Sequence, residues 1–395
     1  MISVARSNRY HIAIFGRRNV GKSSLVNCLA GQAVSIVSDV AGTTTDTVWK
    51  SIELPGVGAA VFADTAGFDD AGELGSMRVD AARKVLARAD AAILLLGEYD
   101  SNAALEKEWL AQMKEQQLPV IVVVGKCDKE GSAERMTAWQ NALDCDIVTF
   151  SAINGEGREA LLERIAMLYK QDDDLDDITH SLAKPGDVVV LVMPQDVSAP
   201  KGRIIQPQVQ TLRNLLDKHC IPLCCAPEEL PHLLQSLVAP PQLIITDSQV
   251  FATVEKLTPP ETKLTSFSVL MARHKGDIDA FLSGAKALLA LPPTARVLIA
   301  EACSHIPQNE DIGRVKLPRL LRSKLGEELK IDIVGGNDFP DDLSAYDIVI
   351  HCGACMFNRR TVLSRVRQAK AQGVPITNYG IAIAALTGII DKVVM

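Results

Sequence analysis

The chain has 395 residues, of which 47% are hydrophobic, and a formal net charge of −7. At roughly 150 residues per domain, this length predicts two or three domains, each with enough apolar residues for its own core. The acidic balance argues against a protein that binds nucleic acid through bulk positive charge.

Nine cysteines are scattered along the chain without the rhythm of a disulfide framework. This usage is typical of a reducing, cytosolic compartment. The first residues lack the apolar stretch of a signal peptide, and no run approaches the roughly 18 apolar residues of a membrane span. We therefore expect a cytoplasmic protein that does not associate with membranes.

The first part of the chain alternates short apolar segments with helical patterns. Buried strands separated by helices are typical of a mostly parallel sheet that is covered on both faces. The sequence predicts an α/β domain over residues 1–172, with strands at 11–16, 59–67, 91–97, 119–128 and 146–152.

After an acidic linker at residues 171–177, the same alternation continues in two smaller segments. We expect α/β domains over 180–268 and 274–395. The first has predicted strands at 187–194, 220–227, 241–248 and 263–270; the second has them at 295–305, 330–336, 346–355 and 374–379. Cys220, Cys224 and Cys225 are predicted to pack in the core of the first.

The segment GRRNVGKSS, residues 16–24, lies between a predicted strand and a predicted helix. It is a G-x-x-x-x-G-K-S phosphate-binding loop in the context that the motif requires. Loop amides bind phosphate oxygens, Lys22 reaches the β and γ phosphates, and Ser23 offers its hydroxyl to Mg²⁺. The predicted contacts are Gly16, Arg17, Arg18, Asn19, Val20, Gly21, Lys22, Ser23 and Ser24.

Two further segments provide the switches of a nucleotide hydrolase. DVAGTTTD contains Thr43 and Thr44, one of which can close on Mg²⁺ and the γ phosphate. DTAG brings Asp64 and the amide of Gly67 to the same place. We predict Ser23 and Thr44 as magnesium ligands, and the catalytic set as Lys22, Thr44, Asp64 and Gly67.

The last two segments indicate that the base of the bound nucleotide is guanine. In GKCD, Asp128 can accept the two donors on the guanine edge, while the stem of Lys126 packs over the base. Ser151 and Ala152 can add backbone contacts to the guanine carbonyl. Five motifs in order predict GTP and Mg²⁺ as ligands.

Two positions depart from the usual pattern. Phe68 occupies the place where Ras-like enzymes have a glutamine that orients water, so intrinsic hydrolysis should be slow. Gly125 replaces the usual asparagine of the base motif, which removes a side chain that ties this loop to the phosphate loop. Guanine preference should survive through Asp128, with weaker affinity.

This half of the chain resembles the TrmE and Era type of GTPase, through DVAGTTTD and Asn19. In the potassium-activated members of that class, an asparagine at this position helps to hold K⁺. The resemblance makes Asn19 a candidate potassium ligand. The alternative is a turn residue, tolerated for its local hydrogen bonding.

The third segment contains a C-x-H group and an H-C-x-x-C group, each at the end of a predicted strand. Ligands gather at the carboxyl ends of strands in open α/β sheets, so both groups could meet at one edge. Three thiolates with a nitrogen suit either an iron–sulfur cluster or zinc. The candidates are Cys303, His305, His351, Cys352 and Cys355.

A TrmE-like GTPase followed by these two segments resembles the HydF family, the maturation GTPases of FeFe-hydrogenase. The usual family motif is H-C-G-G-C, and Ala354 replaces its second glycine. The resemblance implies a 4Fe-4S cluster on Cys303, Cys352 and Cys355, with His305 or His351 as the fourth, exchangeable ligand.

The resemblance also implies a scaffold and carrier that assembles a transient diiron precursor and delivers it to apo-hydrogenase. It implies a homodimer formed by residues 180–268, and partners that are the radical SAM maturases HydE and HydG and the apo-hydrogenase HydA. GTP would act as a timing switch for partner contacts.

Two other classes of protein are weaker alternatives. One is an RNA- or ribosome-associated GTPase with a structural zinc domain, but the third segment has nearly balanced charge and no basic G-x-x-G loop. The other is a metallochaperone, which predicts a histidine-rich tract; the chain has only seven histidines and no such tract. We expect no nucleic-acid partner.

Overall fold

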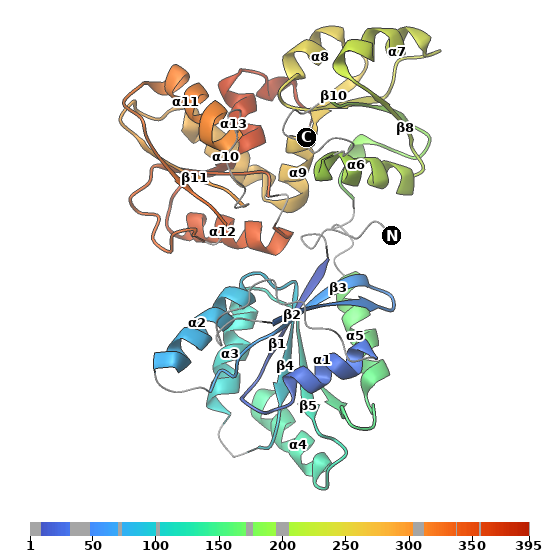
Figure 1. Ribbon diagram of the computed structural model, residues 1–395, viewed down its shortest axis with the longest axis vertical. Coiled ribbons are helices and arrows are strands. Elements are labelled where there is room, and N and C mark those ends of the chain that lie inside the picture. Colours follow the sequence, from blue (N-terminus) through green and yellow to red (C-terminus); the bar gives the residue numbers. More distant parts are fainter. Residues whose placement is uncertain are drawn as a thin grey trace. The chain divides into compact units, whose positions relative to one another are not determined.

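The computed structural model describes residues 9–31, 48–69, 73–99, 103–170, 177–194, 205–302, 312–336, 338–354 and 357–394. The chain divides into two compact units, residues 1–173 and 174–395, and each is described by itself. The predicted fold class is confirmed: an α/β N-terminal unit is followed by two smaller α/β domains (Figure 1). The boundary predicted between the two smaller domains remains an interpretation, because both belong to one unit.

The N-terminal unit is built on a six-stranded sheet with the order β2-β3-β1-β4-β5-β6. All neighbouring strands are parallel except β2, an edge strand absent from the predicted elements, which pairs antiparallel with β3. The apolar strands are buried because helices cover both faces. The strands are β1 (Tyr10–Phe15), β2 (Val48–Leu54), β3 (Gly58–Asp64), β4 (Ala91–Leu96), β5 (Val120–Gly125) and β6 (Ile147–Phe150).

Five helices in the described part of this unit enclose the sheet (Figure 1). One face packs against α1 (Lys22–Ala30) and α5 (Arg158–Lys170). The other face packs against α2 (Glu73–Leu86), α3 (Ala104–Glu115) and α4 (Ser132–Leu143). This layering places the carboxyl ends of β1, β3 and β4 side by side, where the phosphate loop begins.

The second unit holds two four-stranded parallel sheets, with the orders β10-β9-β7-β8 and β12-β11-β13-β14. In each sheet the first strand in the chain lies between the second and third, so the two domains share one strand order. The strands are β7 (Val188–Val192), β8 (Ile221–Cys225), β9 (Leu243–Thr246), β10 (Lys263–Ser266), β11 (Arg296–Ala300), β12 (Lys330–Val334), β13 (Ile348–His351) and β14 (Ile376–Asn378).

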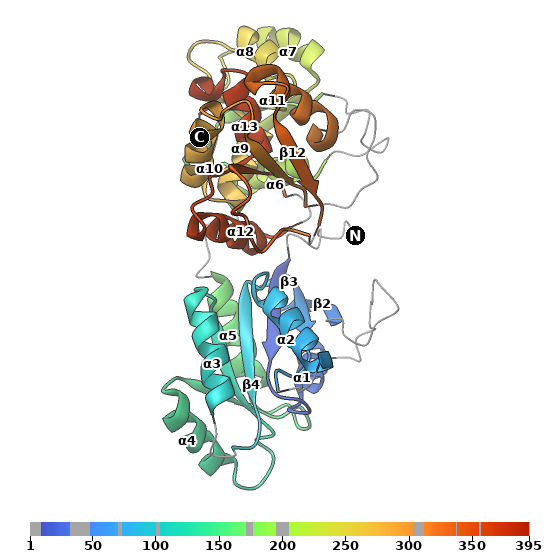
Figure 2. The same ribbon diagram turned by 90° about the vertical axis from the view of Figure 1, so that its left-hand side faces the viewer.

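A continuous apolar core joins the two sheets of this unit, with members that range from Val190 of β7 to Val349 of β13. Two helices, α11 (Leu317–Leu325) and α12 (Arg359–Ala371), cover opposite faces of the β11–β14 sheet (Figure 2). The remaining helices are α6 (Gln206–Asp217), α7 (Leu230–Ser236), α8 (Phe251–Leu257), α9 (Phe267–Lys275), α10 (Ile278–Leu289) and α13 (Tyr379–Leu386).

The structure corrects two sequence-based expectations in this unit. The strand predicted over 263–270 ends at Ser266, whose Oγ accepts a hydrogen bond from the Val269 amide at 3.3 Å and caps α9. Cys224 is exposed and Cys225 is partly exposed, and only Cys220 is buried. The reason is that β8 is an edge strand, which pairs with β7 alone.

Within the described residues, no helix combines the length and the apolar character needed to cross a bilayer.

Candidate functional site

The phosphate loop connects β1 to α1, as the motif predicts. Gly16 is required here, because a Cβ at this position would lie 2.4 Å from the Leu95 carbonyl oxygen. Asn19 and Gly21 both have positive φ values, 58° and 111°. The turn therefore needs residues that tolerate the left-handed region, and asparagine is one of them. This conformation accounts for Asn19 as a turn residue and leaves its K⁺ role a prediction.

Two side chains of the loop have defined partners. Lys22 Nζ donates to the carbonyl oxygens of Gly16 at 3.0 Å and Arg17 at 2.9 Å. Ser23 Oγ donates to Asp64 Oδ2 at 2.5 Å. The hydroxyl and the carboxylate therefore lie together at the start of α1 and the end of β3. This arrangement provides the oxygen ligands that Mg²⁺ prefers.

Arg17 is anchored to α3 by a contact that sequence reasoning missed. Its guanidinium forms a two-point ion pair with Glu106, with Nε–Oε1 at 2.5 Å and Nη2–Oε2 at 3.1 Å. Glu106 is only 2% exposed. A bidentate pair with a buried carboxylate holds the loop in a defined orientation, and no local motif marks Glu106 in the sequence.

The segment after β3 packs directly on the phosphate loop. A Cβ at Gly67 would lie 2.6 Å from the Arg18 nitrogen, so only glycine fits. Asp69 Oδ1 accepts a hydrogen bond from the same Arg18 amide at 2.7 Å. Phe68 points the other way and is buried against Trp109. The side chain at the glutamine position is therefore part of the hydrophobic core.

The residues predicted to bind the base gather at the carboxyl ends of β5 and β6. Ser151 is fully buried and donates from Oγ to Asp128 Oδ1 at 2.5 Å. This hydrogen bond lowers the pKa of Asp128 and keeps its carboxylate an acceptor. Arg135 Nη2 donates to the Lys126 carbonyl at 2.8 Å and supports the turn in which Lys126 has a positive φ. Ala152 packs against the core of the α1 face.

Several predicted residues lie outside the described parts of the chain. They are Thr43 and Thr44 of the first switch, and Cys303, His305 and Cys355 of the predicted cluster site. Their roles stay predictions. Among the residues that are described, no group of three or more histidine, cysteine, aspartate or glutamate side chains is placed to hold a metal ion.

The second candidate site lies where β11 and β13 run side by side. These strands pair in parallel, with Ala300 opposite His351. β12 lies on the far side of β11, and β14 lies on the far side of β13. The carboxyl ends of β11 and β13 therefore form the topological switch point, where open α/β sheets bind ligands. Cys352 Sγ accepts the Ala302 amide at 2.9 Å and the Ala354 amide at 3.4 Å. The residues that precede Cys303 and Cys355 thus both touch the Cys352 sulfur.

His351 is buried and both of its ring nitrogens are engaged. Arg365 Nη1 donates to Nε2 at 2.9 Å, because a guanidinium can only donate. The ring proton is therefore on Nδ1, which donates to the Cys352 carbonyl at 2.8 Å. Burial and the charge of Arg365 lower the pKa of His351 to about 3, so the ring is neutral.

Lys275 also contacts this loop, and sequence reasoning did not identify it. It ends α9, is 5% exposed, and donates from Nζ to the carbonyls of Ala354 and Phe357, both at 3.1 Å. Ala354 has a φ of 52°, the left-handed conformation that a glycine would adopt more easily. We refer to residues 351–354 and Phe357, with these contacts, as the cluster loop.

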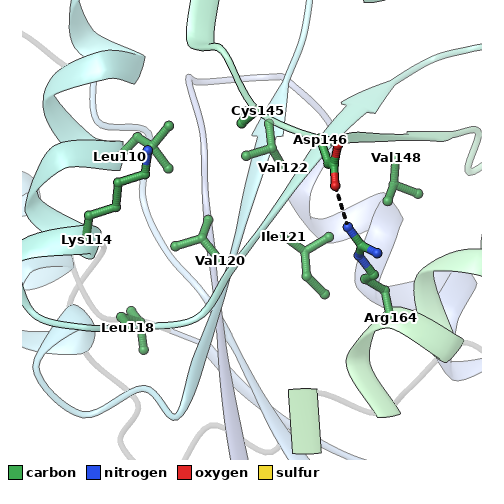
Figure 3. Close-up of a pocket in the computed structure, with 10 residues that line it drawn as sticks. All are labelled: Leu110, Lys114, Leu118, Val120, Ile121, Val122, Cys145, Asp146, Val148 and Arg164. Carbon is green, nitrogen blue, oxygen red and sulfur yellow. Dashed lines mark hydrogen bonds and ion pairs between the residues drawn. The ribbon is translucent and has the colours of Figure 1, made fainter. Parts of the chain in front are cut away.

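A pocket of about 280 Å³ lies elsewhere, at the amino ends of β5 and β6 (Figure 3). One side of it is closed by an ion pair between Arg164 and Asp146, 3.1 Å apart. The phosphate and base segments lie at the opposite edge of the sheet, where β1, β5 and β6 have their carboxyl ends. The pocket therefore contains none of the predicted site residues.

Family models match three successive parts of the chain. Residues 11–126 match the model described as 50S ribosome-binding GTPase. Residues 178–276 match the hydrogen maturase F dimerization domain, and residues 279–395 match the hydrogen maturase F tetramerization domain.

Similar proteins share the N-terminal part. GTPase Der of Wolinella succinogenes is 37% identical over 168 residues, which cover 40% of this chain and 36% of that protein. The tRNA modification GTPase MnmE of Xanthomonas euvesicatoria pv. vesicatoria is 37% identical over 165 residues, 41% of this chain and 34% of that one. The chain thus spans about a third of the length of these relatives. Among solved structures, the G domain of the T. maritima FeoB iron transporter is 24% identical, covering 40% of this chain and 98% of that one, with a TM-score of 0.32.

The phosphate loop, the base segment and the mostly parallel sheet define the N-terminal unit as a P-loop GTPase domain. The rest of the chain matches the dimerization and tetramerization domains of one family, whereas the sequence predicted self-association only for the first of these two segments. The chain belongs to the hydrogen maturase F family.

Proposed function

We propose that this protein is a GTP-hydrolysing scaffold and carrier that binds a 4Fe-4S cluster, assembles the diiron precursor of the FeFe-hydrogenase active site, and delivers it to apo-hydrogenase. One observation carries the proposal. A P-loop GTPase domain shares a chain with a cysteine loop at the switch point of a hydrogen maturase F domain. The scattered cysteines favour the cytoplasm as its compartment.

The nucleotide part of the proposal rests on described contacts. Ser23 and Asp64 together provide oxygen atoms for Mg²⁺, and Asp128 is held ionised for the guanine edge. Phe68 is buried, so it cannot orient the attacking water, and intrinsic turnover should be slow. We assign Thr44 as the second magnesium ligand and Asn19 as a candidate K⁺ ligand by resemblance.

The cluster loop fits a thiolate-bound cluster. Cys352 Sγ receives two amide N–H groups, a common way to stabilise sulfur ligands of iron–sulfur clusters. Cys303 and Cys355 directly follow the two residues that donate these amides. When bound, such a cluster supplies iron with one exchangeable ligand position. Both nitrogens of His351 are engaged, which favours His305 over His351 as that fourth ligand.

We further propose a homodimer formed through the β8 edge. Ile221 on this strand is 52% exposed, and the neighbouring helix α6 exposes Val209 and Leu216. The outer edge of β8 has no strand beside it, and exposed strand edges readily pair with another chain. The domain that contains β8 also matches the dimerization model. The radical SAM maturases HydE and HydG, and the apo-hydrogenase HydA, are the proposed transient partners.

Metal analysis tests the proposal. Anaerobically purified and reconstituted protein is assayed for iron, acid-labile sulfide and zinc, with an EPR spectrum of the reduced sample. About four irons and four sulfides per chain, with a cluster signal, support the proposed function. One zinc without sulfide would replace it with the RNA-associated GTPase carrying a structural zinc domain.

A further inference from the structure

Two buried cations contact the cluster loop from different elements. Lys275 comes from the end of α9 and Arg365 from the middle of α12, and their exposed fractions are 5% and 7%. Buried lysine and arginine side chains are uncommon, because removing a charge from water is costly unless other groups compensate. Their shared position at this loop therefore needs an explanation.

Lys275 contacts the loop close to Cys352. Its ammonium donates to the Ala354 carbonyl and to the Phe357 carbonyl, the residues on either side of the segment 355–356. Ala354 also donates its amide to Cys352 Sγ at 3.4 Å. One residue therefore contacts both the Lys275 ammonium and the sulfur of a predicted thiolate ligand.

Arg365 supports the other end of the loop. Its guanidinium lies between the rings of Phe339 and Phe357, 4.6 Å from each centroid. It donates to the Gly336 carbonyl at 2.6 Å and to His351 Nε2. His351 in turn donates to the Cys352 carbonyl, so Arg365 reaches the same predicted ligand through one neutral ring.

These charges have a direct consequence for a bound cluster. A thiolate-ligated 4Fe-4S cluster gains one negative charge when it takes up one electron. A nearby buried cation stabilises the more negative form, since charge interactions are strong where water is excluded. Net charge and hydrogen bonds around a cluster are among the factors that set its reduction potential.

We propose that Lys275 and Arg365 are positioning residues that clamp the cluster loop and raise the reduction potential of the cluster. This inference rests on the proposed function, because it requires a cluster at Cys352. It assigns the last residue of a helix in the dimerization domain a role in the redox properties of the next domain.

The test is a potentiometric titration followed by EPR, on reconstituted full-length protein with dithionite as the reductant. Lys275→Met should keep iron and sulfide content but shift the midpoint potential to a more negative value. Lys286→Met, which removes an exposed lysine from α10 of the same unit, should leave the potential unchanged. A potential for Lys275→Met equal to that of the unmodified protein would overturn the inference.

A second pair of variants covers the case in which Lys275→Met cannot retain a cluster. Arg365→Lys keeps the charge, whereas Arg365→Met removes it from the same stacked position. The methionine variant should have the more negative potential of the two, and equal potentials would refute the role of charge. If the unmodified protein itself binds no iron and sulfide, the proposed function fails instead, so the two failures are distinguishable.

Discussion

The ring of Phe68 stacks on the indole of Trp109, with centroids 5.5 Å apart and ring planes 20° apart. This contact places the residue at the glutamine position of the second switch inside the core, on the face of the sheet covered by α3. Packing, and not catalysis, is therefore the role that the structure assigns to Phe68.

Restoring the Ras-like residue should not accelerate hydrolysis. Phe68→Gln buries an amide and loses ring contacts, which should destabilise the N-terminal unit by about 2 to 4 kcal/mol. All three tryptophans, at positions 49, 109 and 139, lie in this unit, so their fluorescence in urea reports its unfolding within the full chain. Phe68→Leu, the apolar control, should lower the free energy of unfolding by less than Phe68→Gln. Faster phosphate release by the glutamine variant would show that this side chain reaches the nucleotide.

Gly125→Asn should tighten GTP binding. A Cβ at this position would lie 3.3 Å from Leu95 Cδ1, a flexible tip, and 3.8 Å from the Val20 carbonyl oxygen. The added amide can donate to that carbonyl and tie the base loop to the phosphate loop. One such hydrogen bond lowers the Kd for GTP by roughly 2-fold to 10-fold, measurable with a fluorescent GTP analogue. Gly125→Ala adds only the methyl group, so an equal gain there would contradict this mechanism.

Cluster binding and GTP turnover should separate by mutation. Cys303→Ala, Cys352→Ala or Cys355→Ala should each remove bound iron and sulfide and leave phosphate release nearly unchanged. The control is Cys224→Ala, since Cys224 is exposed on β8. Conversely, Lys22→Ala or Ser23→Ala should stop turnover and leave the metal content intact. A cysteine variant with full iron and sulfide would remove that residue from the ligand set.

Charge on the β8 edge should weaken self-association. Ile221→Lys adds an ammonium group to the edge strand, a substitution that opposes strand pairing between chains. Sedimentation velocity should show more monomer than in the unmodified protein. Val238→Lys is the matched control, because Val238 is fully exposed and lies outside β8. A dimer that persists unchanged in Ile221→Lys would place the interface elsewhere.

The second unit should lose stability in mild acid through His274. Its Nδ1 is buried without a hydrogen-bond partner among the described residues, and burial, with Lys275 and Arg359 nearby, lowers the pKa of His274 to about 4. The pKa of this histidine is near 6.5 in the unfolded chain. Between pH 6.5 and about pH 4 the unfolded chain binds the proton and the folded chain does not, so the free energy of unfolding falls as the pH falls. From pH 7 to pH 5 the loss is about 2 kcal/mol.

Urea unfolding followed by far-UV circular dichroism measures this loss, with tryptophan fluorescence identifying the N-terminal transition. His274→Gln should flatten the pH dependence of the second transition. His232→Gln, at an exposed position, should leave it as it is. An unchanged slope in His274→Gln would assign the acid sensitivity to other groups.

Local patterns in the sequence determined the α/β class, the motif residues and most strands. Gly16, Lys22 and Ser23 could be predicted because their motif has fixed spacing along one strand, turn and helix, and Asp128 because it belongs to a short motif that directly follows an apolar strand. The apolar runs predicted strands because parallel strands are buried on both faces. These signals are local, so they need no knowledge of packing.

Only the tertiary structure decided which distant residues support these sites. Glu106 contacts Arg17 across 89 positions, and Lys275 contacts Ala354 across 79. The predicted strand at 263–270 became a helix after Ser266 because a side-chain cap and core contacts outweighed apolar, strand-like residues. Long-range contacts depend on how the sheets order and pack, and that information is spread over the whole chain and not concentrated in any one motif.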